Sequence, residues 1–166
     1  MLHLVRGWFT IRWRFPHWSP ARRDQAVQQW SQGILDILGL QLRIDGQLLQ
    51  HGPLMLVCNH ISWLDIAVLH AAVHCRFISK DDIRGWPVLG TLASGAGTQA
   101  PVQALGLRFE DATRGTPSFA PCYVGEETLL DSVWRTVCAP PLRAVLCCAP
   151  VQHAGGRDRR QWASAL

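Results

Sequence analysis

The chain opens with apolar residues at helical spacing, interleaved with arginines. This period predicts an amphipathic helix whose apolar stripe consists of Leu4, Trp8, Ile11 and Phe15. A second helix is predicted over Arg22–Leu38, because a glycine follows it in the position of a C-cap. Aromatic rings beside guanidinium groups are typical of a helix at a membrane surface, and equally of a helix packed on its own domain with solvated arginines.

Beyond residue 40, short apolar runs of strand length alternate with helical patterns. Strands are predicted over 41–46, 54–58, 75–79, 101–109, 121–124 and 142–151. Helices are predicted over 63–73, 86–90 and 126–137, and a further helix starts at 158. Such alternation predicts an α/β fold. In this fold class, sites gather where strand ends open into loops and helix N-termini.

The stretch Asn59–Asp65 lies at such a junction and places a histidine five residues before a carboxylate. On one continuous helix, five residues rotate two side chains about 140° apart, so they could not share a face. With His60 in the loop, Ser62 as the helix N-cap and Asp65 in the first turn, the two side chains can converge as a general base and the group that orients it. The alternative is a capping box, in which Ser62 and Asp65 only satisfy backbone N–H groups.

Composition limits the class of protein without choosing a partner. A chain of 166 residues with 48% hydrophobic and 17% charged residues is typical of one folded domain. Its net charge of +4 favours anionic partners such as phosphorylated metabolites, anionic lipid or nucleic acid. Lys80 is the only lysine among sixteen basic residues. No apolar run approaches the roughly 18 residues of a transmembrane helix.

Cysteine and histidine spacing predicts neither disulfides nor a metal site. The six cysteines form no C-x-x-C pair, which favours buried free thiols in a reducing compartment. His70 and His74 stand four residues apart, as metal ligands on a helix sometimes do, but no third ligand accompanies them. A metal-dependent hydrolase that uses these two with His60 and Asp65 is therefore the weakest of the functional hypotheses.

Four short motifs follow one another at characteristic distances: Asn59-His60-x-Ser62-x-x-Asp65, Phe77-x-x-Lys80, Trp86-Pro87-x-x-Gly90 and Ala96-Gly97-Thr98. Their order and spacing resemble the glycerolipid acyltransferases, most closely the bacterial 1-acylglycerol-3-phosphate acyltransferases. The resemblance implies a mixed sheet flanked by helices. It also implies two parts, N-terminal amphipathic helices over 1–40 and the acyltransferase-like α/β domain over 41–166.

The resemblance implies acyl transfer to a lysophospholipid such as lysophosphatidate. His60 would remove the proton of the acceptor hydroxyl, and Asp65 would orient the imidazole. Asn59, Ser62 and Lys80 would contact substrate. The acyl donor would be acyl-CoA or an acyl-carrier protein, with no further cofactor, no metal and no nucleic acid. The protein would lie peripherally on the cytoplasmic side of the inner membrane.

The chain departs from the family after Thr98. Members continue into a strand with an arginine and later into a Phe-x-Glu-Gly-Thr segment, both assigned to the acceptor phosphate, whereas this chain passes directly to Gln99 and Pro101. Several dozen residues are thus expected to be missing, and the phosphate would depend on Lys80, Arg84, Arg76 or Arg108. A lyso-ornithine lipid is as compatible an acceptor as a glycerol phosphate. The alternative function is a catalytically impaired member that acts as a lipid-binding module at the membrane surface.

Overall fold

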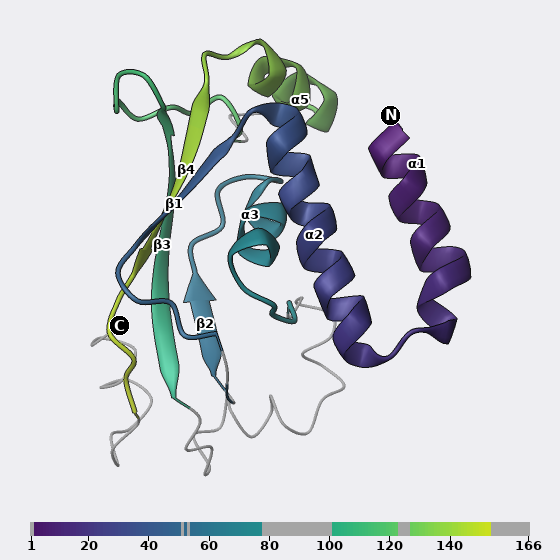
Figure 1. Cartoon of the computed structure of the whole chain (residues 1–166). Helices are drawn as coiled ribbons and strands as arrows, with labels where there is room; N and C mark the ends of the chain where they lie inside the picture. Colours follow the sequence, from purple (N-terminus) through teal and green to yellow (C-terminus); the bar gives the residue numbers. More distant parts are fainter. Residues whose placement is uncertain (1, 51, 53, 78–100, 123–126, 154–166) are drawn as a thin grey trace.

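The computed structural model describes residues 2–50, 52, 54–77, 101–122 and 127–153, which form a mixed sheet with helices packed on it (Figure 1). The strands are β1 (Gln41–Asp45), β2 (Met55–Cys58), β3 (Val102–Asp111) and β4 (Leu142–Cys148), in the spatial order β1-β4-β3-β2. β1 is parallel to β4 and β2 is parallel to β3, whereas β3 and β4 are antiparallel. The predicted α/β fold is confirmed.

The N-terminal helices pack on each other through two glycines. Helix α1 (Leu2–Phe9) continues as a π-helical turn, η1 (Thr10–Arg14), and a 3-10 turn, η2 (Phe15–His17), and runs beside α2 (Pro20–Leu38) (Figure 1). His3 stacks on Trp30 with ring centroids 5.4 Å apart. A side chain on Gly7 would collide with Trp30, and one on Gly33 would collide with His3, so only glycine permits this approach.

Helix α2 matches its prediction closely. It begins at Pro20, two residues earlier than predicted, because the Ser19 hydroxyl caps it by accepting the Arg22 N–H. It ends as predicted at Gly39, whose φ of 63° is left-handed. Among the described residues, no helix is long and apolar enough to cross a membrane. The division of the chain at residue 40 stays a prediction.

The core lies between the sheet and the helices α2 and α3 (Asp65–Ala72). Leu105, Leu107 and Phe109 alternate along β3 and join a buried cluster with Leu35 of α2 and Val68 of α3. The intervening β3 residues point to the opposite face, where the buried Glu110 carboxylate is contacted by Arg43, Arg108 and Arg143. These basic side chains of the sheet therefore lie on the face that points away from α2 and α3.

Two predicted strands are wrong in the described part. Cys75–Phe77 has no regular structure: Cys75 packs against the core and the Phe77 ring meets His70 edge-on, with centroids 5.0 Å apart. An apolar run alone does not establish a buried strand, and Arg76 and Phe77 are exposed in this loop. Of 121–124, only Cys122 is described in a pairing, an isolated bridge to Ser62.

Helix α5 (Leu129–Cys138) starts three residues later than predicted. Thr128 and Asp131 form a reciprocal capping box, which ends the preceding loop at Thr128. The predicted elements at 86–90 and from 158 lie outside the described residues. So does the expected junction after Thr98; the loss of a segment there stays a prediction.

Candidate active site

His60 and Asp65 meet where β2 ends and α3 begins. His60 Nδ1 lies 2.8 Å from Asp65 Oδ2. The histidine side chain is 73% exposed and the aspartate side chain only 3%. An ionised Asp65 accepts the Nδ1 proton, which leaves Nε2 as the basic nitrogen on an exposed ring. The predicted convergence of the two side chains is present, while their catalytic role stays a prediction.

Asp65 also organises the backbone of the loop that carries the histidine. Its Oδ2 accepts the N–H of Ile61 at 2.7 Å and that of Ser62 at 2.9 Å, besides the imidazole. Its Oδ1 is buried without a hydrogen-bond partner among the described residues. Three donors on one oxygen hold the carboxylate and the loop in a single arrangement. The catalytic and capping interpretations of Asp65 are therefore compatible, since one oxygen serves both.

Asn59 joins the loop to the sheet. Its Nδ2 donates to the Leu107 carbonyl at 2.8 Å, and its Oδ1 accepts the Leu107 N–H at 2.7 Å. The side-chain amide thus continues the β2–β3 pairing one residue beyond Cys58. This ties the residue before His60 to a core strand. Contact between Asn59 and a substrate, implied by the resemblance, would have to replace these two bonds.

Ser62 is buried, and its hydroxyl is used within the chain. Oγ donates to the Pro121 carbonyl at 2.7 Å and accepts the Leu64 N–H at 3.1 Å. The prediction of Ser62 as the N-cap is wrong, because Ser62 forms a β-bridge, residues 63 and 64 form a turn, and α3 begins at Asp65. Only half of the capping box exists: Asp65 accepts the Ser62 N–H, but Oγ bonds Leu64 instead of Asp65. A role of Ser62 in substrate contact stays a prediction.

Three residues that the sequence did not single out, Trp63, Pro121 and Ser132, hold the motif through hydrogen bonds. The indole of Trp63 donates to Ser132 of α5 at 3.2 Å, and Ser132 donates to the Pro121 carbonyl at 3.1 Å. Pro121 therefore accepts both Ser62 and Ser132. No spacing in the sequence points to this set, since the contacts span 11 to 69 positions.

Of the four basic residues considered for the acceptor phosphate, the structure describes two, Arg108 and Arg76. Arg108 lies on the polar face of the sheet, near Glu110 at 3.7 Å and donating to the Cys147 sulfur at 3.1 Å. Arg76 is exposed in the loop after α3. Lys80 and Arg84 lie outside the described residues.

The two histidines considered as metal ligands face different partners. His74 Nε2 lies 3.4 Å from the Asp24 carboxylate of α2, and the His70 ring contacts Phe77. Burial, with a smaller effect of His74, lowers the pKa of His70, so this ring is neutral at pH 7. Within the described ranges, no cluster of three or more His, Cys, Asp or Glu side chains could hold a metal ion.

Cys58 lies beside the motif but is a poor nucleophile. Burial, and then the nearby Asp65 charge, raise the pKa of its thiol to about 11. At neutral pH, on the order of one molecule in ten thousand would carry the thiolate. The thiols are free throughout, but only Cys122 is fully buried and Cys138 is exposed, so the prediction of buried thiols holds in part. A covalent acyl-cysteine intermediate at Cys58 is not supported.

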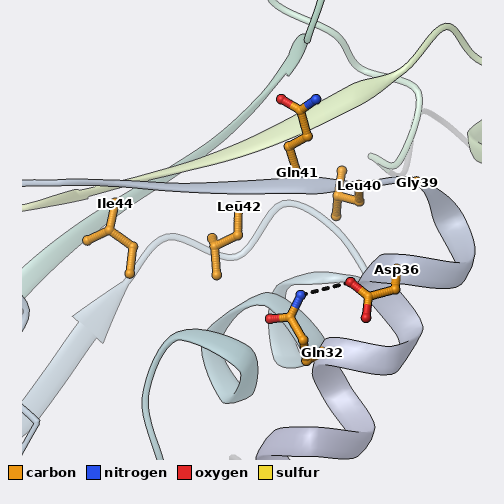
Figure 2. Close-up of a pocket in the computed structure, with 7 residues that line it drawn as sticks. All are labelled: Gln32, Asp36, Gly39, Leu40, Gln41, Leu42 and Ile44. Carbon is orange, nitrogen blue, oxygen red and sulfur yellow. Dashed lines mark hydrogen bonds between the residues drawn. The ribbon is translucent and has the colours of Figure 1, made fainter.

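A groove lies beside the edge strand β1, away from the histidine. It has a volume of about 580 Å³ and is lined by residues from the end of α2 and from β1: Gln32, Asp36, Gly39, Leu40, Gln41, Leu42 and Ile44 (Figure 2). Gln32 donates to Asp36 at 3.0 Å across one turn of α2. None of the motif residues lines this groove.

Comparison with known proteins supports the resemblance. The acyltransferase family model matches residues 41–101, which include β1, β2, the motif and α3. A lyso-ornithine lipid O-acyltransferase of Rhizobium meliloti is 39% identical over 66 residues, which are 40% of this chain and 23% of that protein. A 1-acyl-sn-glycerol-3-phosphate acyltransferase of Neisseria meningitidis is 36% identical over 80 residues, 48% of this chain and 31% of that protein.

The similarity extends further in a lyso-ornithine lipid O-acyltransferase of Pseudomonas aeruginosa, with 34% identity over 95 residues, 57% of this chain and 36% of that protein. The chain thus spans about a quarter to a third of the length of these curated relatives. No solved structure matches it. Residues 41–101 thus match the acyltransferase family, and the chain is similar there to bacterial acyltransferases of lysolipids.

Proposed function

We propose that the chain transfers a fatty acyl group from a thioester to the free hydroxyl of a lysolipid. The observation that carries this proposal is the exposed His60 imidazole held at 2.8 Å by the buried Asp65 carboxylate. A base held in this way can remove a proton once the acceptor hydroxyl is bound beside it. The names of the relatives, which describe acyl transfer to lyso-ornithine lipid and to 1-acyl-glycerol-3-phosphate, support this class of acceptor.

The proposed reaction needs no group beyond the two substrates. His60 Nε2 takes the proton of the acceptor hydroxyl while the oxygen attacks the thioester carbonyl. Asp65 stabilises the imidazolium that forms, as the aspartate does in a Ser-His-Asp triad. When the tetrahedral intermediate collapses, the C–S bond breaks, the imidazolium returns its proton to the thiolate, and an ester and a free thiol remain. The donor would be acyl-CoA or acyl-carrier protein.

The acyl-transfer test uses the whole chain with radiolabelled acyl-CoA or acyl-carrier protein and each of two acceptors, lysophosphatidate and a lyso-ornithine lipid. We expect label in the diacyl product and release of one thiol per ester formed. Release of thiol without ester would show hydrolysis instead of transfer. Product formed no faster than without protein, with both donors and both acceptors, would refute the proposal.

A second candidate function is a lipid-surface module of the same family without turnover. The observation that favours it is the outer side of the N-terminal helix, where Leu4, Trp8 and Ile11 are each more than half exposed. The helix packs on α2 through His3 and Gly7, which leaves these three residues of the predicted apolar stripe facing outward. The fourth, Phe15, is half-buried beside Trp18. We propose that this stripe lies at the membrane–water interface, with the protein peripheral on the cytoplasmic side of the inner membrane.

Trp13 of η1 is exposed like Trp8. Replacing both by serine is expected to weaken binding to vesicles of anionic lipid by about tenfold or more, since each indole contributes on the order of 1 kcal/mol at the interface. Co-sedimentation at rising salt measures this, and binding of the native chain should fall with salt. Ile37→Ser is the matched control, because this side chain is equally exposed but stands at the far end of α2. Equal binding by all three chains would contradict the orientation.

A further inference from the structure

Helix α5 docks with its polar side inward. Its buried residues are Ser132 and Thr136, whereas Leu130 and Trp134 are 77% and 71% exposed. An amphipathic helix on a core normally shows the reverse pattern. The reason lies in its partner: α5 packs against the backbone of 120–122, whose carbonyls need hydrogen-bond donors.

The Arg135 guanidinium supplies two of these donors. Its Nε donates to the Ala120 carbonyl at 2.9 Å, and one terminal nitrogen donates to the Cys122 carbonyl. The other terminal nitrogen donates to Glu127 Oε2 at 2.6 Å, which fixes the plane of the group. Arg135 therefore holds the carbonyls on both sides of Pro121.

The segment held in this way is the one that touches the motif. The Pro121 carbonyl accepts Ser62 Oγ, and Cys122 forms a β-bridge with Ser62. Ser62 in turn donates its N–H to the Asp65 oxygen that binds His60. A continuous set of hydrogen bonds thus runs from α5 through 120–122 to the His60–Asp65 pair.

We propose that Arg135 is a positioning residue for this pair. The proposal deepens the proposed function, on which its kinetic part rests. Arginine is required because its rigid fork reaches two carbonyls and a carboxylate at once, whereas the single ammonium of lysine cannot span them. Without these hydrogen bonds, residues 120–122 are held less firmly, and the loop from His60 to Leu64 is no longer fixed by the contacts of Ser62 with Pro121 and Cys122.

Amide hydrogen exchange of the whole chain reads this effect at the loop itself. In Arg135→Met, the Ile61 and Ser62 amides, which bond to Asp65, are expected to exchange about tenfold faster or more, while amides of β3 and β4 keep their rates. Arg43→Met is the matched control: it removes an arginine whose ion-pair partners, Asp45 and Glu110, lie on the sheet and outside 120–122. It should leave both loop amides unchanged.

Kinetics give a second readout. Misplacement of a catalytic base lowers turnover more than binding, so kcat should fall about ten- to a hundredfold with KM within about threefold of the native value. Arg135→Lys keeps the charge and should restore only part of both readouts. It also carries the test if the methionine variant does not fold.

Native exchange rates at Ile61 and Ser62 in both variants would overturn the positioning role. Faster exchange that extends evenly over β3 and β4 would also overturn it, because this pattern reports only a loss of global stability. Amide exchange needs no substrate. An inactive native chain would therefore count against the proposed reaction alone, and would leave the exchange result to decide the role of Arg135.

Discussion

Replacing His60 by glutamine is expected to lower kcat for acyl transfer by about a hundred- to ten-thousandfold, the usual contribution of a placed general base. The glutamine amide has a similar length and can still bond the Asp65 carboxylate, but it cannot accept a proton at neutral pH. Since the histidine side chain is 73% exposed, its loss should change the free energy of unfolding by no more than about 0.5 kcal/mol. Initial rates of ester formation and thermal unfolding measure the two effects.

His74→Gln is the matched control for this variant. His74 is partly exposed and lies beside a carboxylate, Asp24, yet stands after α3 and outside the motif. It should keep native turnover. Turnover by His60→Gln within threefold of the native chain would remove the histidine from the reaction and favour the lipid-surface module as the function.

The elements with complete local signals were predicted well. Gly39 ends α2 in the structure as predicted, whereas the helix starts at Pro20 and not at the predicted Arg22, because Ser19 caps it. That His60 and Asp65 can converge was predicted from the strand-to-helix junction between them, and the structure shows the contact. The cap was misplaced at Ser62 because its hydroxyl has a better partner 59 positions away, the Pro121 carbonyl. Competition between a local cap and a distant acceptor leaves no trace in a local pattern.

The same limit explains α5. Its helical pattern predicts the helix without saying which side is buried, and the structure buries Ser132 and Thr136 against the carbonyls of 120–122. Only knowledge of the partner decides which side of a helix is buried. Asn59 was singled out in the sequence only as part of a family motif. In the structure its side chain continues the β2–β3 pairing through two hydrogen bonds to Leu107.

Replacing Asp65 by asparagine is expected to abolish most activity while sparing much of the fold. The amide oxygen can take the place of Oδ2 and still accept the Ile61 and Ser62 N–H groups. It lacks the negative charge that stabilises an imidazolium and selects its tautomer. In a Ser-His-Asp triad the same substitution costs about ten-thousandfold in kcat. We expect at least about a hundredfold in this chain, measured as initial rate of ester formation.

The Asp65→Ala variant separates the two roles of the carboxylate, which orients His60 and accepts the N–H groups of the loop. It removes the acceptor for both loop amides, and each buried N–H left without a partner costs about 1–3 kcal/mol. In a chain of this size, about 2 kcal/mol lowers Tm by about 4–8 °C. Alanine should therefore lose activity and stability together, whereas asparagine should lose chiefly activity. Equal Tm values for both variants would show that the two backbone hydrogen bonds to Asp65 do not stabilise the fold.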